Sequence, residues 1–177
     1  MDDKTPKLEH LIWAAGGLFA GAWWAKNQHY EAKKSRAERD DPKAVEEVCN
    51  AIAPILDDWE PEIYDTEDEY VEDLFDYLCE DEDTEGFGIE MCPNTREGKP
   101  DILIDDILAI ELKCNLSKAE RDRLIGQTAA YSREWVTWIV LIDTPDSRVG
   151  AVEKLLADKG LAHILVFAFS SEDDDEE

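Results

Sequence analysis

Positive charge is scarce in this sequence, and one long segment has none. The 177 residues include 18 Lys and Arg against 44 Asp and Glu, which gives a formal net charge of −26. Between Lys43 and Arg96 there is no Lys or Arg. Nucleic-acid binding normally depends on contacts from Lys and Arg to phosphates, so this charge balance argues against such a partner at ordinary salt concentrations.

The acidic excess has two competing explanations. A disordered acidic chain is one, but the 44% apolar content and the clear periodicity of the second half argue against it. The other is adaptation to very high salt, where the Debye length falls to about 3 Å at 1 M. We favour this explanation and expect a halophilic source, an archaeon or its virus. High salt also removes most of the electrostatic objection to DNA.

Cysteine and histidine patterns typical of zinc sites are lacking as well. The four cysteines form no C-x-x-C pair, and no His stands at zinc-ligand spacing. We therefore expect reduced thiols in a cytosol, with packing as their role. These residues are Cys49, Cys79, Cys92 and Cys114.

Long apolar runs are also few, and the one at Leu11–Ala25 has no charge. As a helix it would span about 22 Å, short of the ~30 Å hydrocarbon core of a bilayer. Basic residues between Lys26 and Arg39 follow it, as expected for a membrane anchor that leaves the rest in the cytoplasm. Gly17 and Gly21 form a G-x-x-x-G pair that favours a homodimer. The alternative is a helix buried in an oligomer or against the domain of a soluble cytoplasmic protein.

Three parts follow from these patterns. Residues 1–41 contain the hydrophobic helix and a basic linker, residues 42–171 form one α/β domain, and residues 172–177 form an acidic disordered tail. In the domain, residues 42–59 are predicted to be a helix that Pro54 bends or ends. A second helix begins at a Thr66–Glu69 capping box and runs to Glu80.

The rest of the domain alternates between strand and helix patterns. Residues 88–92 are predicted to be a strand, and residues 101–104 and 107–113 a hairpin closed by Asp105 and Asp106. A Ser117–Glu120 capping box starts a helix that contains Tyr131. Residues 135–143 and 161–169 are predicted strands on either side of a helix over 149–159, which indicates a parallel part of the sheet. We expect a mixed central sheet.

Charged residues interrupt the second strand of the hairpin on one face. Alternation places Glu111 and Lys113 together there, opposite an apolar set. Such a pair is costly to bury without a partner. We expect the partner to be a divalent cation held with Asp101, because hard cations such as Mg²⁺ prefer oxygen ligands. Gln127 and Tyr131 are four residues apart and therefore share one side of the next helix.

The spacing P-D-x(9)-E-x-K from Pro100 to Lys113, followed by Q-x-x-x-Y on a helix, resembles the PD-(D/E)xK nuclease superfamily. The resemblance covers about residues 65–143. It implies a restriction-endonuclease-like three-layer α-β-α core and a DNA endonuclease dependent on Mg²⁺ or Mn²⁺. It also implies an acidic residue on the inward face of the helix that runs to Glu80, where Glu67 projects, with Glu72 as a substitute.

The resemblance further implies a role for each site residue. The metal ligands would be Asp101, Glu111, Glu67 and the backbone carbonyl of Leu112. Lys113 would orient or deprotonate the attacking water, Gln127 would position that water or Lys113, and Tyr131 would brace the site.

Five basic residues are predicted to contact the nucleic-acid backbone, two just before the motif and three in the first turns of the helix: Arg96, Lys99, Lys118, Arg121 and Arg123. For the first pair, a solubilising loop is the alternative. Two other functions also remain open. One is a catalytically inactive relative that binds nucleic acid or protein, and the other is a structural membrane-associated protein.

Overall fold

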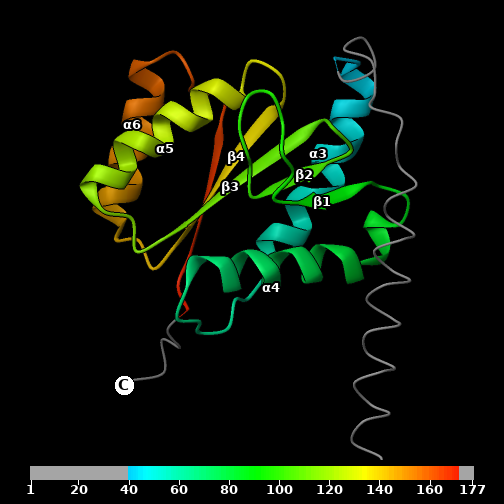
Figure 1. Ribbon diagram of the computed structural model, residues 1–177, viewed down its shortest axis with the longest axis horizontal. Helices are drawn as coiled ribbons and strands as arrows, with labels where there is room; N and C mark the ends of the chain where they lie inside the picture. Colours follow the sequence, from blue (N-terminus) through cyan, green and yellow to red (C-terminus); the bar gives the residue numbers. More distant parts are fainter. Residues whose placement is uncertain (1–39, 172–177) are drawn as a thin grey trace, which may run out of the picture. The chain divides into compact units, whose positions relative to one another are not determined.

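Five strands form a single mixed sheet in the order β1-β2-β3-β4-β5 (Figure 1). The computed structural model describes residues 40–171. Strands β1 (Ile89–Met91), β2 (Ile102–Ile104) and β3 (Leu108–Cys114) pair antiparallel, one after the other. Strands β4 (Val136–Ile142) and β5 (Leu165–Phe169) then extend the sheet in parallel with β3. The predicted hairpin and the predicted parallel part are both confirmed.

Helices cover both faces of this sheet. On one face lie α3 (Pro42–Asp57) and α4 (Glu67–Glu80), and on the other lie α5 (Lys118–Tyr131) and α6 (Asp146–Asp158) (Figure 1). A 3₁₀ turn, Glu82–Thr84, follows α4. This α/β architecture is compatible with three layers, helices–sheet–helices. The described residues all belong to one compact unit.

The alternation of side chains in β3 and β4 divides the core into two halves. One half packs on α3 and α4, and it contains the even-numbered residues Leu108, Ile110, Leu112, Trp138, Val140 and Ile142. The odd-numbered residues Ile139 and Leu141 of β4 pack on α5 and α6 instead. Ala109 of β3 also contacts the α5 side, through Tyr131. Glu111 and Lys113 therefore belong to the face of β3 that α5 covers.

Capping boxes fix the starts of the two helices that approach the end of β3. Thr66 N donates to Glu69 Oε2 over 2.9 Å at the start of α4. Ser117 N donates to Glu120 Oε2 over 3.0 Å at the start of α5. Both boxes were predicted, and both are confirmed. They satisfy backbone donors that have no partner inside the helix.

Several element boundaries differ from the prediction. Pro54 lies inside α3 and does not end it. Helix α6 begins at Asp146, directly after Pro145, and not at residue 149 as predicted. The prediction started too late because the first turn of the helix has no apolar periodicity. The last strand is Leu165–Phe169 and not the whole of 161–169. The four cysteines are free thiols, as expected.

Some predictions concern residues outside the described part of the chain. These are the membrane anchor at Leu11–Ala25, the Gly17–Gly21 dimer contact and the tail at 172–177. Within residues 40–171, every helix is too short or too polar to span a bilayer.

Candidate active site

The Lys113 side chain lies at the centre of an acidic cluster at the end of β3. Its Nζ atom is 2.7 Å from Glu67 Oε1, 3.2 Å from Glu111 Oε1 and 3.7 Å from Asp101 Oδ2. It also donates a hydrogen bond to the backbone carbonyl of Leu112. One ammonium group thus contacts all four groups that the sequence predicts as metal ligands.

Asp101 and Glu67 are both held in place by the backbone of β3. Asp101 comes directly before β2, and its Oδ2 accepts a hydrogen bond of 2.8 Å from Leu112 N. Glu67 is the first residue of α4, and its Oε2 accepts one of 3.4 Å from Cys114 N. The capping box therefore aims Glu67 at the end of β3. Glu72 is exposed on α4, and the structure does not bring it to the cluster.

Glu111 is the most deeply buried member of the cluster, at 1% exposure. Its Oε2 atom is buried and has no hydrogen-bond partner. Burial, and then the negative charge of Asp101, raise its pKa from 4.5 to about 7. Burial also raises the pKa of Asp101. Three carboxylates facing one ammonium leave the cluster short of positive charge, so protonation or a further cation would relieve it.

Lys113 stays charged in this environment. Burial by itself lowers its pKa, but the carboxylates of Asp101, Glu111 and Glu67 raise the pKa by more, and the net effect is an increase. At neutral pH the side chain is therefore an ammonium ion that donates hydrogen bonds, and not a base that accepts a proton.

A cavity of about 610 Å³ opens above the cluster. The four charged residues form its floor, and the loop before β2 forms one wall, with Gly98 and Lys99. Helix α5 forms another wall with Arg123, Gln127 and Tyr131. The cavity is thus a concave space that brings together the predicted catalytic residues and two cations.

The donor set suits a hard divalent cation, because each predicted ligand atom is an oxygen. Among the described residues no group of three His, Cys, Asp or Glu side chains is arranged to hold a metal ion. The Lys113 ammonium lies where the predicted ligands converge, and it occupies the position that a metal ion would take between them. The buried Glu111 Oε2 has no partner, and it is the atom that a cation would satisfy. The chemistry of the donor atoms, although not their present spacing around Lys113, therefore suits Mg²⁺ or Mn²⁺.

No family model, curated protein or solved structure matches the chain.

Gln127 and Tyr131 meet in the wall of the cavity, as their spacing predicts. Burial, and then the charge of Glu111, raise the pKa of Tyr131. The Gln127 side chain and the backbone of Lys99 lie beside the Tyr131 hydroxyl, and each lowers its pKa. Gln127 Oε1 is buried without a partner, which leaves it free to accept a hydrogen bond from a bound molecule.

Gly98 also shapes this wall, although no motif in the sequence singles it out. Its φ of +140° favours glycine, and a Cβ built there would lie 2.9 Å from Tyr131 Cε1. The contact lets the loop before β2 pack directly on the tyrosine ring. The only signal in the sequence is a glycine in the turn-rich connection before the motif.

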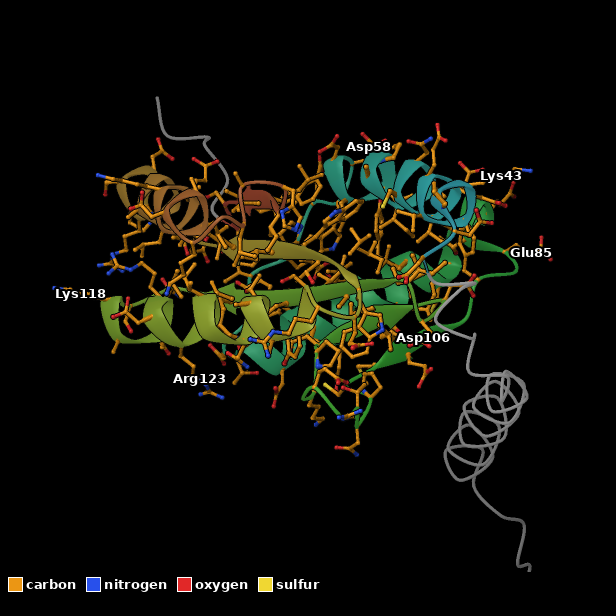
Figure 2. All side chains as sticks on the ribbon, turned by 90° about the horizontal axis from the view of Figure 1, so that it is seen from above. Lys43, Asp58, Glu85, Asp106, Lys118 and Arg123 are labelled. Atoms are coloured by element: carbon orange, nitrogen blue, oxygen red, sulfur yellow. The ribbon has the colours of Figure 1, made fainter. Side chains whose placement is uncertain are left out.

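The five predicted DNA-binding residues do not gather at one place. Lys99 and Arg123 line the cavity. The Arg96 side chain is 93% exposed and lies 3.8 Å from Glu97. Lys118 and Arg121 line a different cavity. Figure 2 shows Lys118 and Arg123 at separate positions along α5.

Proposed function

We propose that this chain is a metal-dependent nuclease that hydrolyses phosphodiester bonds in DNA, with a restriction-endonuclease-like fold of the PD-(D/E)xK superfamily. One observation carries the proposal. Glu67, Asp101, Glu111 and the Leu112 carbonyl, from three separate parts of the chain, surround a single cation, the Lys113 ammonium. A cluster of this kind in an open cavity is costly for stability, which favours a role in binding or catalysis.

The order of elements supports the same proposal. Helix α4, strand β1, the β2–β3 hairpin, helix α5 and strand β4 follow one another in the order on which the resemblance rests. Asp101 comes directly before the hairpin, Glu111 and Lys113 lie in its second strand, and Gln127 and Tyr131 lie in the helix after it.

Each side chain has a task that its position permits. Asp101, Glu111 and Glu67 would hold the metal, which would act as a Lewis acid and lower the pKa of a bound water. Lys113, kept protonated by its neighbours, stabilises the negative charge that develops on the phosphate. Gln127 offers its free Oε1 to orient the attacking water.

Tyr131 and the cations at the rim complete the assignment. Tyr131 lies beside Gln127 in the wall of the cavity and would brace it. Lys99 and Arg123 line the same cavity and would contact phosphates beside the one that is cut. At high salt the acidic surface is screened beyond about 3 Å, so DNA can approach these residues.

The N-terminal segment adds a location to this proposal. Leu11–Ala25 remains a predicted membrane anchor, and its Gly17–Gly21 pair remains a predicted dimer contact. Together they would place the nuclease at the cytoplasmic side of a membrane.

A cleavage assay in molar salt tests the function. The purified chain is mixed with supercoiled, linear, single-stranded and branched DNA, with Mg²⁺, with Mn²⁺ or with a chelator. We expect cleavage only with metal, and its loss in Lys113→Ala. Glu72→Gln, which changes an exposed carboxylate on α4, is the matched control and should cleave normally. No cleavage of any of these substrates in either metal would refute the proposal.

A further inference from the structure

Strand β5 is an open edge of the sheet, and it lacks the features that protect such edges. It pairs with β4, and within residues 40–171 no strand pairs with its outer side. Protected edges are short, charged, bulged or interrupted by Pro, which prevents pairing with another chain. The opposite edge, β1, is three residues long and carries the exposed Glu90. Strand β5 has the apolar sequence LVFAF and an unbroken register with β4.

The side chains of β5 are poorly covered. No residue of β5 is buried, whereas every residue of β4 after Val136 is. Leu165 is 49% exposed. It shares one face of the sheet with Phe167 and Phe169, because these three residues pair with alternate residues of β4. An incompletely covered apolar strip of this kind marks a contact surface.

Backbone groups on the outer side of β5 are open to pairing as well. The Phe169 carbonyl accepts a hydrogen bond of 3.0 Å from Asp143 N, so the backbone polar groups of Phe169 point toward β4. These groups alternate in direction along a strand. Those of Val166 and Ala168 therefore point away from β4. A row of such donors and acceptors is a template for a further strand.

We propose that β5 pairs with β5 of a second copy of this chain, antiparallel and about a two-fold axis at Phe167. In this register Val166 of each copy exchanges both backbone hydrogen bonds with Ala168 of the other. Leu165 of each copy lies opposite Phe169 of the other, and the exposed leucine is covered. A two-fold contact has to be self-complementary, and an uncharged strand paired in this way meets that condition. None of the residues of the acidic cavity takes part, so the inference does not depend on the proposed function.

The distribution of charge supports a second copy as the occupant of this edge. Two copies that each carry a net charge of −26 repel each other wherever their acidic surfaces meet, and β5 has no charge. Residues 159–171 contain Lys159 and His163 but no Asp or Glu, and residues 172–177 are all acidic. Antiparallel pairing directs the chain that leaves one β5 toward the segment that enters the other. The two ends of the interface are therefore complementary in charge.

Sedimentation equilibrium of the full chain, in molar salt and with a mild detergent in every sample, tests the inference. The variants Leu165→Lys and Ala168→Lys place a charge on either face of β5, at exposed positions that permit folding. The matched control is Met91→Lys, at an exposed apolar position on the opposite edge strand. We expect dimers for the unsubstituted chain and the control, and a dissociation constant at least about tenfold higher for both β5 variants. Equal dissociation constants for the β5 variants and the control would overturn the inference.

The salt dependence of the dimer gives a second check. Repulsion between the two acidic copies reaches about 10 Å at 0.1 M salt and about 3 Å at 1 M. Backbone hydrogen bonds and apolar contacts across β5 are not screened in this way. We therefore expect a lower dissociation constant at 1 M than at 0.1 M. A dimer that dissociates at 1 M salt would show that charge pairs hold it together, and would overturn the inference.

Hydrogen exchange distinguishes pairing through β5 from the predicted Gly17–Gly21 contact. The Val166 and Ala168 amides should exchange at least about 100-fold more slowly in the dimer than in the Leu165→Lys monomer. A dimer in which these amides exchange freely would show that the contact lies elsewhere, and would overturn the inference. Slow exchange in a chain that stays monomeric would show that another segment of the same chain covers β5, and would overturn it too.

Discussion

Replacing Glu111 by Gln is expected to stabilise the metal-free protein increasingly as the pH rises from 5 to 8. The pKa of the buried carboxyl is about 7 in the folded chain, against 4.5 for the free group. Because the folded value is the higher one, the fold favours the neutral form, and ionisation costs stability at every pH above 4.5 until the cost levels off above 7. At about 1.4 kcal/mol for each pKa unit, the change between pH 5 and pH 8 is roughly 2.5 kcal/mol.

Urea unfolding at fixed ionic strength in the presence of a chelator measures this effect. The fluorescence of buried Trp59, Trp135 and Trp138 reports the transition. Subtracting the wild-type free energy of unfolding from that of the variant at each pH removes the contribution of the other acidic residues. The difference should rise by about 2.5 kcal/mol in favour of the variant. Glu72→Gln, the exposed control, should give a flat difference.

A flat difference for Glu111→Gln, or one that falls with pH, would refute the electrostatic reasoning. Added Mg²⁺ gives an independent check, because a ligand that binds only the folded state raises its stability. Mg²⁺ should therefore stabilise the wild type at pH 8 and have a much smaller effect on Glu111→Gln.

Two further substitutions test the cluster and the wall of the cavity. Lys113→Ala leaves the buried Glu111 without its counter-charge and should destabilise the fold by about 3–5 kcal/mol at pH 8 and by less at pH 5. An equal loss at both pH values in urea unfolding would contradict this. Gly98→Ala should cost about 1–3 kcal/mol through the contact with Tyr131 and should slow cleavage. Gly150→Ala, where a Cβ meets nothing within 4 Å, should gain about 0.5–1 kcal/mol in the same urea unfolding. If the Gly98→Ala protein were as stable as the Gly150→Ala protein, the loop before β2 would have to move away from Tyr131 at little cost.

Local patterns in the sequence were sufficient to place most of the cluster. Strand alternation requires Glu111 and Lys113 to share a face, and the capping box at Thr66 orients Glu67 toward the core. Both inferences depend only on a few neighbouring residues, and the packing of distant parts of the chain has little influence on them. The same holds for the pair formed by Gln127 and Tyr131.

Other features depend on packing between distant parts of the chain. The approach of Gly98 to Tyr131 joins a loop to a helix more than thirty residues later, and no local signal encodes it. The position of the Lys113 ammonium among its acidic neighbours likewise follows only from the assembled site. Sequence spacing specifies on which face of a strand a side chain lies, but not which charged groups surround the amine of a lysine there.

Helix geometry explains why the basic residues predicted on α5 do not lie on one face. At about 100° per residue, Arg121 and Arg123 are roughly 200° apart and point to nearly opposite sides. Lys118 lies close to the direction of Arg121, while Gln127 lies close to that of Arg123. The sequence therefore contained the information that these cations serve two cavities.

The nicking of supercoiled plasmid in molar salt, with Glu111→Gln beside the wild type, tests the central claim most directly. Both proteins are first shown to be folded by their unfolding transitions. We predict Mg²⁺-dependent nicking by the wild type and a rate at least about 100-fold lower for the variant, the size of effect seen when one group that stabilises a transition state is removed. Equal rates for the two proteins, or no nicking by the wild type with either Mg²⁺ or Mn²⁺, would contradict the claim that this acidic cavity cuts DNA.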